Sequence, residues 1–374
     1  MPRAALITTR DGERESLSAA GQWRLMWRSF RRHRMALVSA VIIAGLYFVA
    51  MFADFFSSDD PTASDELVTF LPPQRIYWFD QGSLRPHLLA ITSRRDPTTF
   101  RKYYATDPAV KLPLRFFGRG YEYRLFGLIP ADRHLLVIEQ NRRASPYLLG
   151  ADHLGRDLLA RILRGSRVSL TIGLVGVAIS LILGVFFGGI SGYYGGMADT
   201  AIQRLIEILR SIPGLPLWIA LAAALPKDWS IVQVYFAITV IIALYGWTEL
   251  ARVVRGRLLA MREEDFIVAA RLTGARDVEI IFHHMVPNFA SHLIAVATLA
   301  IPGMIIGETS LSFLGLGLRP PAISWGVLLQ AAQNVQTVAL YPWLMLIAAP
   351  VIVTVLAFNF VGDGLRDAAD PYSR

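Results

Sequence analysis

Residues 263–288 read EEDFIVAARLTGARDVEIIFHHMVPN and form a charged, amphipathic stretch between two long apolar segments. Polar helices that connect membrane spans lie outside the hydrocarbon core, where they contact water, lipid headgroups or another protein. What this stretch binds is therefore the best guide to what the protein does.

Two amphipathic helices are predicted within this stretch. Apolar or small residues recur at the spacing i, i+3, i+4 and i+7 in each half and form one stripe per helix. The stripes are Phe266, Ala269, Ala270 and Thr273 in the first helix, and Val278, Ile281, Phe282 and Met285 in the second. On periodicity alone, a pair of helices lying on the lipid surface is an alternative to a protein-docking element.

The ends of the two helices carry recognisable signals. Glu264 and Asp265 stand at the start of the first helix, where acidic side chains favour the helix dipole. Gly274 can adopt the left-handed conformation that ends this helix. We expect Asp277 to cap the second helix and Pro287 to end it before the next span.

The composition indicates a membrane protein. The 374 residues are 54% hydrophobic and 18% charged, with a mean hydropathy of +0.43, which is too apolar for a soluble domain. The absence of cysteine excludes disulfides, thiolate catalysis and cysteine-ligated metal. The net charge of +8 comes almost entirely from arginine and indicates cytoplasmic anchoring rather than nucleic-acid binding.

Six stretches are apolar enough to cross the bilayer as helices of about 20 residues. They are residues 35–55, 168–190, 201–225, 231–250, 290–314 and 343–361. The predicted fold class is therefore an all-α polytopic membrane protein with six transmembrane helices. Within the second stretch, Gly184 and Gly188 have the small-xxx-small spacing of helix contacts, which fits intrachain packing and a partner subunit equally well.

Charge predicts the orientation. Arginines cluster before the first span and acidic residues follow it, so the positive-inside rule places the N-terminus, and after six spans the C-terminus, in the cytoplasm. Arginines 156–167 lie on the predicted outer side, but they end a loop of about 110 residues, and long loops translocate largely regardless of charge. The resulting division is a cytoplasmic segment 1–34, a first helix 35–55, a periplasmic loop 56–167, a five-helix core 168–362 that includes the cytoplasmic loop 252–289, and a cytoplasmic tail 363–374.

The long outer loop is rich in aromatic residues. Its stretch LRFFGRGYEYRLFGL, from Leu114 to Leu128, has two β-prone runs around Gly118-Arg119-Gly120 and predicts a hairpin with its turn there. The alternative is a disordered linker, against which the many aromatic side chains argue.

The stretch 263–288 resembles the EAA loop of ABC-importer permeases, through Ala269-Ala270, Gly274, Ile281 and Pro287-Asn288. In that family the loop forms a coupling helix that docks in a groove on the cytoplasmic ATPase. Val268 replaces the usual glutamate of the motif, so no role is carried over to that side chain. The resemblance implies an ATPase-coupling role for Glu264, Asp265, Phe266, Ala269, Ala270, Gly274, Asp277, Ile281, Phe282 and Pro287.

Four further stretches are similar to the dipeptide/oligopeptide (peptide/opine/nickel) branch of that family, in its C-type subunit. They are LGADHLGRDLLARILRGSRVSLTIG at 149–173, GYYGG at 192–196 followed by Asp199, ETSLSFLGLG at 308–317 and GDGLRDAADP at 362–371. Their order and the spans between them match the family. The resemblance implies a type I ABC importer fold with a long extracytoplasmic loop between the first and second spans.

The resemblance also implies a function and partners. The chain would be the transmembrane permease subunit of an ATP-driven importer in the bacterial inner membrane. It would pair with a homologous second permease, two cytoplasmic ATPase subunits and a periplasmic solute-binding protein. Short peptides are the expected solute, and opines, nickel complexes or oligosaccharides are alternatives within the same family.

The chain lacks the motifs of an enzyme. No segment matches the phosphate-binding GxxxxGK motif followed by Ser or Thr, so we expect ATP and magnesium to be bound by the partner ATPases and no cofactor to be bound by this chain. The histidines show no metal-ligand spacing, and no nucleophile motif is present. The rival from another class is a stand-alone secondary transporter or channel, which would need an inverted repeat that the sequence does not show.

Ionisable residues within spans are costly and mark sites of interest. Glu308 lies inside the fifth span, with Ser310 and Ser312 nearby. These residues are expected either to line the translocation path or to contribute to packing. Arg204, Glu207 and Arg210 begin the third span at spacings that allow pairing on one face, or they anchor it at the interface.

Overall fold

The computed structural model describes residues 24, 26–95, 97–98, 102–139 and 145–369. Most of the predicted N-terminal segment and the last residues of the tail lie outside this range. Five helical segments are long and apolar enough to cross a membrane. They are α2 (Arg34–Met51), α4 (Leu158–Tyr194), α7 (Ile231–Met261), α11 (Ala290–Phe313) and the segment Pro342–Ala369, in which the short η3 (Pro342–Ile347) leads into α14 (Ala348–Ala369).

The predicted third span is a bent pair of helices. α5 (Gly196–Ser211) and α6 (Gly214–Ala223) meet at an angle of 84°. The break falls at Ile212-Pro213, because proline has no backbone N–H and disfavours the helical conformation in the residue before it. The pair counts as a sixth span only if both helices belong to one crossing.

α4 and α7 are longer than the hydrophobic stretches that predicted them, whereas α2 ends at Met51, before the predicted residue 55. α4 begins at Leu158, ten residues before the expected start of the second span at residue 168, because Asp157 caps it by accepting a hydrogen bond from the Ala160 N–H at 3.1 Å. α7 continues beyond the expected end of the fourth span at residue 250 and reaches Met261. Apolar length identifies the part of a helix that crosses lipid, but capping decides where the helix begins.

Close glycine contacts hold α4 against α7. A Cβ atom at Gly184 would lie 2.6 Å from the Leu250 Cβ, and one at Gly188 would lie 2.5 Å from the Ala251 carbonyl oxygen. Gly192 continues the row against Arg255 and Leu258. The small-xxx-small spacing therefore serves packing within the chain rather than contact with a partner subunit.

The loop between the first and second spans folds into a four-stranded antiparallel sheet, and we call residues 57–157 the insert. The strands are β1 (Tyr77–Asp80), β2 (Ser83–Arg95), β3 (Lys102–Leu125) and β4 (Ile129–Ile138), in the order β1-β2-β3-β4. The long strand β3 pairs with β2 through its first half and with β4 through its second. The membrane part of the fold is helical as predicted, and the insert adds this sheet.

The predicted hairpin is present, but its turn was placed wrongly. β3 runs without a turn through Gly118 and Gly120, and the chain reverses at Phe126-Gly127-Leu128. A Cβ atom at Gly118 would lie 2.1 Å from Val137, and one at Gly120 would lie 2.6 Å from His134. These two glycines therefore serve the close approach of β4 rather than a reversal of the chain.

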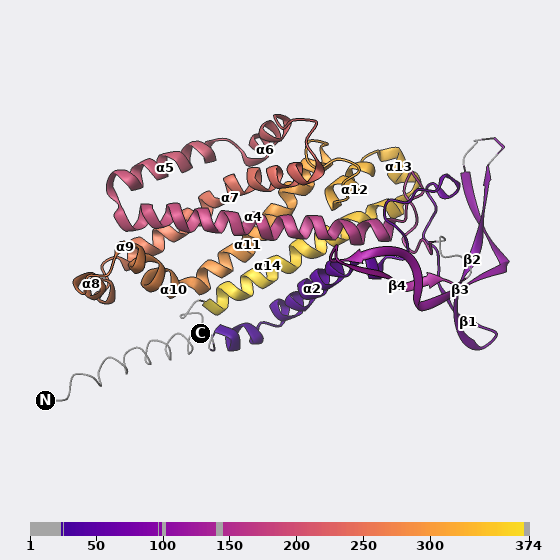
Figure 1. The fold of residues 1–374 in the computed structure, drawn as a ribbon, viewed down its shortest axis with the longest axis horizontal. Coiled ribbons are helices and arrows are strands. Elements are labelled where there is room, and N and C mark those ends of the chain that lie inside the picture. The colour runs from indigo at the N-terminus through magenta and orange to yellow at the C-terminus, as the bar shows by residue number, and fades with distance from the viewer. Residues whose placement is uncertain (1–23, 25, 96, 99–101, 140–144, 370–374) are drawn as a thin grey trace.

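Polar contacts attach the sheet to the helices. The Nδ1 atom of His134 on β4 lies 2.8 Å from the Asp54 carbonyl oxygen and 2.7 Å from that of Ser57, at the end of the short α3 (Ala53–Phe56). The Asp54 carboxylate pairs with Arg164 at 2.8 Å and with Arg167 at 2.7 Å on α4. In Figure 1 the sheet lies at one end of the helix bundle, and α8–α10 lie at the other, together with the start of α2 and the end of α14.

Candidate functional site

The amphipathic stretch predicted from the sequence folds at the end of the bundle remote from the sheet (Figure 1). Its first helix is α8 (Asp265–Leu272), and Gly274 follows it with φ +82°. The Gly274 N–H donates to the Arg271 carbonyl at 3.0 Å, and the Ala275 N–H donates to that of Ala270 at 3.1 Å. Gly274 is thus the left-handed residue that ends the helix, as its position in the sequence predicted.

The second helix differs from the prediction in two ways. It begins as α9 (Asp277–Glu279), widens into the π-helical turn η2 (Ile280–Met285) and continues as α10 (Val286–Asn288) towards α11. Pro287 does not end it at once, since α10 runs on to Asn288, and the π-helical turn η2 lies just before this proline. The break before α11 falls instead at Phe289.

Asp277 is not the helix cap. The N-cap position belongs to Arg276, and the Asp277 carboxylate accepts a hydrogen bond of 2.7 Å from the Tyr193 hydroxyl at the end of α4. The Arg271 guanidinium lies over the ring of the same tyrosine, 5.1 Å from its centroid. Tyr193 therefore joins both helices of the segment to α4.

The residues buried on one side of this segment agree only in part with the predicted apolar stripes. Ile281 and Met285 are buried as expected, together with Ile267 and Ile280, which the stripes did not include. These side chains pack into a cluster with residues of α4, α7 and α11: Tyr193, Leu250, Val254, Leu258 and Leu293. The segment is therefore anchored to three spans through one apolar core.

The opposite side of the segment presents apolar side chains to the outside. We call this set the docking surface, and it comprises Phe266, Val268, Leu272, Val278 and Phe282. Leu272 is 84% exposed. Glu264 and Asp265 are exposed beside it, as is Ala269, whereas Ala270 is half-buried. Several large apolar side chains exposed together on a segment that is already anchored are typical of a surface that binds another protein.

A second set of contacts fixes the neighbouring helices. The Arg255 guanidinium on α7 holds the Asp199 carboxylate on α5 through two contacts of 2.5 Å each. Arg210 on α5 pairs with Glu249 on α7 at 2.5 Å, while Arg204 pairs with Glu207 at 2.7 Å. The sequence allowed the Arg204–Glu207 pair, with anchoring at the interface as the alternative, but it did not indicate the pairs that connect α5 to α7, whose members lie far apart in the chain.

Glu308 lies in a buried polar cluster within the helices. Its Oε1 accepts hydrogen bonds from Ser312 at 2.8 Å and Ser324 at 2.7 Å, and its Oε2 accepts one from Ser169 at 3.1 Å. Glu308 and the three serines are each 0% exposed. Ser310 is two residues from Ser312 and therefore points to a different side of α11. It is half-buried, and among the contacts described here none joins it to the Glu308 carboxylate.

Each of the three serines also accepts a backbone N–H. Ser312 accepts from Leu318 at 3.0 Å, Ser324 from Val327 at 3.2 Å, and Ser169 from Trp325 at 3.1 Å. The cluster thereby connects α4, α11 and α12 (Trp325–Ala331). The sequence identified Glu308 and Ser312, whereas Ser169 and Ser324 were missed because nothing local marks them as its partners.

Comparison with known proteins gives the family. The model of the binding-protein-dependent transport system inner membrane component matches residues 184–374, and that of the N-terminal transmembrane domain of oligopeptide transport permease C matches residues 21–73. The chain therefore belongs to the family of binding-protein-dependent transport system inner membrane components. It is a multi-pass inner membrane permease subunit of the oligopeptide C type, as the sequence motifs indicated.

This chain aligns with most of the length of several related permease proteins. An oligopeptide transport system permease protein of Bacillus subtilis is 29% identical over 97% of this chain and 94% of the relative. One of Haemophilus influenzae is 40% identical over 61% of this chain and 71% of the relative. A glutathione transport system permease protein of Pectobacterium atrosepticum is 39% identical over 61% of this chain and 73% of the relative.

Proposed function

We propose that the transporter built on this chain imports short peptides and is driven by ATP. Relatives named for oligopeptide and glutathione transport support this solute class, since glutathione is itself a tripeptide. The chain would form a heterodimer with a homologous second permease. A periplasmic solute-binding protein would deliver the peptide, and two ATPase subunits would bind ATP and magnesium on the cytoplasmic side.

The docking surface is the observation that carries the coupling part of this proposal. It lies at the end of the bundle remote from the insert (Figure 1) and joins the spans through the buried side chains Ile267, Ile281 and Met285. A rigid helical segment that fits a groove on a partner can transmit motion through packing contacts and needs no catalytic group. With this end in the cytoplasm and the insert in the periplasm, both chain termini lie in the cytoplasm.

The contacts behind the docking surface define how motion would reach the spans. Tyr193 ties the segment to α4 through Asp277, and Arg255 ties α7 to α5 through Asp199. When ATP closes the ATPase dimer, displacement of α8 and η2 would tilt these helices together. We assign Glu308 a packing role in this movement, because its buried cluster keeps α4, α11 and α12 together.

Charge reversal on the docking surface tests the coupling. Phe282→Glu should release the ATPase subunits from the purified complex and abolish peptide uptake, because a charge cannot enter an apolar groove without a partner. Phe79→Glu is the matched control, since Phe79 is also an exposed phenylalanine but lies on β1 at the opposite end. Wild-type uptake and ATPase retention in the Phe282 variant would contradict the coupling role.

The solute requires a separate test. ATPase activity of the complete reconstituted complex should rise with short peptides presented on the binding protein. An opine, a nickel chelate and an oligosaccharide serve as the alternative solutes. Stimulation by one of these instead would assign that solute class to the transporter in place of peptides. Uptake by this chain without ATPase subunits would indicate a stand-alone transporter.

A further inference from the structure

The turn between β3 and β4 is made of apolar residues that remain exposed. With the first two residues of β4 it reads Phe126-Gly127-Leu128-Ile129-Pro130, and all five residues are exposed. Leu128 is 82% exposed. Hairpin turns in water are built mainly from glycine, asparagine, aspartate and serine, whose polar groups satisfy the reversing backbone. A turn without one polar side chain is therefore unusual for a surface that faces water.

This turn lies against the outer end of the first span. The Phe126 ring contacts that of Phe52 at a centroid distance of 5.8 Å, and the Phe117 ring contacts that of Phe55 at 6.1 Å. Phe126 adopts φ +54°, a left-handed conformation that costs a residue with a side chain of this kind free energy. The backbone thus accepts strain while the ring packs on the end of α2.

Hydrogen bonds of a buried histidine fix the hairpin to the end of the first span. His134 on β4 holds the carbonyl oxygens of Asp54 and Ser57 through Nδ1, and its Nε2 lies 2.9 Å from the Tyr121 carbonyl oxygen on β3. The imidazole is completely buried. Since both strands of the hairpin are connected to the end of the first span through this ring, the turn cannot move away from the span without breaking these contacts.

The turn continues the exposed apolar surface of the first span. On α2, Phe48 and Met51 are exposed side chains of a transmembrane helix, and the Phe48 ring lies 4.9 Å from that of Phe52. Phe52 in turn contacts Phe126 of the hairpin. Apolar surface therefore runs without interruption from the first span to the β3–β4 turn, and Figure 1 shows β4 beside the outer end of α2.

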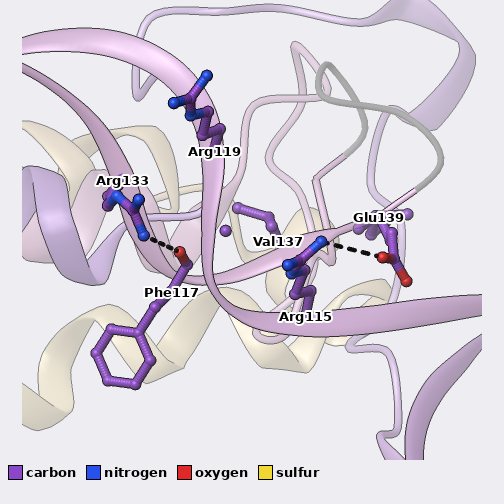
Figure 2. Close-up of a pocket in the computed structure, with 8 residues that line it drawn as sticks. Arg115, Phe117, Arg119, Arg133, Val137 and Glu139 are labelled. Atoms are coloured by element: carbon purple, nitrogen blue, oxygen red, sulfur yellow. Dashed lines mark hydrogen bonds and ion pairs between the residues drawn. The ribbon is translucent and has the colours of Figure 1, made fainter.

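Arginines accompany this apolar surface on the same hairpin. Figure 2 shows Arg115, Arg119 and Arg133 projecting from β3 and β4, and Arg124 adjoins the turn itself. Arg115 and Arg119 are partly neutralised by Glu139 and Asp132, at 3.3 Å and 3.5 Å. Arginine beside exposed aromatic and aliphatic side chains is typical of segments that rest in the headgroup region of a membrane, where guanidinium groups bind phosphate.

We propose that the β3–β4 turn inserts into the outer leaflet of the membrane and holds the insert on the lipid surface. Phe126, Leu128 and Ile129 enter the boundary between headgroups and acyl chains. Arg124, two residues before Phe126, binds the phosphates of phospholipid headgroups. The insert thus has a lipid-bound edge at β4, and β1, at the other edge of the sheet, faces water.

The natural absence of cysteine makes the test direct. Leu128→Cys, carrying a nitroxide spin label, is reconstituted as part of the complete transporter in vesicles of phosphatidylethanolamine and phosphatidylglycerol. Its collision rates with oxygen, which concentrates in lipid, and with a water-soluble nickel chelate are measured. Leu84→Cys is the matched control, since Leu84 is also an exposed leucine, at 69%, and follows the β1–β2 turn.

The label at residue 128 should collide more with oxygen than with the nickel chelate, and the label at residue 84 should show the reverse. Ile129→Cys supplies a second site on the turn and should behave as residue 128 does. Nickel accessibility at residues 128 and 129 equal to that at residue 84 would place the turn in water and overturn the proposal. Protection from both reagents would show that a protein, rather than lipid, covers the turn, and would overturn it equally.

Discussion

The Tyr193 hydroxyl donates a hydrogen bond of 2.7 Å to the Asp277 carboxylate. These two residues are 84 positions apart in the chain and connect the last turn of α4 to the segment that carries the docking surface. Neither residue belongs to the docking surface. Removing this bond therefore tests how the segment is anchored to α4 without changing the surface that would bind the ATPase.

Tyr193→Phe should therefore weaken coupling and leave ATPase binding intact. The ring still packs under Arg271, and only the hydrogen bond is lost, which is worth about 1.5–3 kcal/mol when the acceptor is charged. We expect lower peptide uptake per ATP hydrolysed in proteoliposomes, with unchanged recovery of ATPase subunits. Tyr103→Phe, on the exposed face of β3, is the control. Loss of the ATPase from the Tyr193 variant would assign this tyrosine to docking instead.

Gly274→Ala should destabilise the segment by about 1–2 kcal/mol, because alanine is strained at a φ of +82°. Gly256→Ala is a matched control, since a Cβ meets nothing within 4 Å at either glycine. Gly256 lies inside α7, where the same change should stabilise by about 0.5–1 kcal/mol. Thermal unfolding of the detergent-purified complex measures both. Equal effects at the two glycines would show that backbone conformation does not decide the result.

Glu308→Ala should be among the most destabilising changes in the chain. It leaves the hydroxyls of Ser169, Ser312 and Ser324 without their buried acceptor, at about 1–3 kcal/mol for each unsatisfied group. Glu308→Gln keeps one carbonyl acceptor and should fall between this variant and the wild type. Expression level and the unfolding temperature in detergent report the order, with the exposed Glu207→Gln as control. A Glu308→Ala variant as stable as wild type would remove the packing role.

The insert should be more stable in mild acid than at alkaline pH. Burial, followed by the nearby Asp157 carboxylate, raises the pKa of Asp59 to about 7, and burial also raises the pKa of Asp157. Between about pH 4 and pH 7 the folded protein holds a proton that the unfolded chain has released, so stability falls as pH rises through this window and levels off above it.

Asp59→Asn should remove much of this dependence. Because one pKa unit corresponds to about 1.4 kcal/mol and Asp59 is only partly buried, we expect a gain of about 1–2 kcal/mol at pH 8 and little change at pH 4. Unfolding temperatures of the purified complex across this range measure it, and Glu122→Gln is the control on the exposed part of β3. An unchanged pH profile in the Asp59 variant would contradict this assignment.

Local signals predicted the parts of the fold that depend on neighbours in the sequence. Gly274 ends α8 because a left-handed residue is required there, and Ile281 and Met285 are buried because helical periodicity places them on one side. Periodicity could not show that Phe266 and Phe282 are exposed, since a stripe identifies a face of a helix but not what covers it. The buried partner of η2 comes from α4, α7 and α11, which only the tertiary fold brings together.

Residues distant in sequence account for the rest. Ser169 lies 139 positions from Glu308, so no spacing rule could pair them. The hairpin was misplaced because Gly118 and Gly120 have the composition of a turn, whereas their function is to accommodate Val137 and His134 on the facing strand. A pair of glycines indicates that side chains are disfavoured at those positions. Whether the reason is a turn or a closely packed facing strand can be decided only from the tertiary structure.

α4 comprises 37 residues, and at 1.5 Å per residue it is about 55 Å long. Near its start it holds α3, at the base of the insert, through Arg164 and Arg167, and its last residue but one is Tyr193. One continuous helical rod therefore extends from the insert end of the bundle to the docking-surface end. If ATP hydrolysis tilts α4 about its middle, its Tyr193 end and its Leu158 end move in opposite directions. The same movement would then reposition the outer entrance that receives the solute.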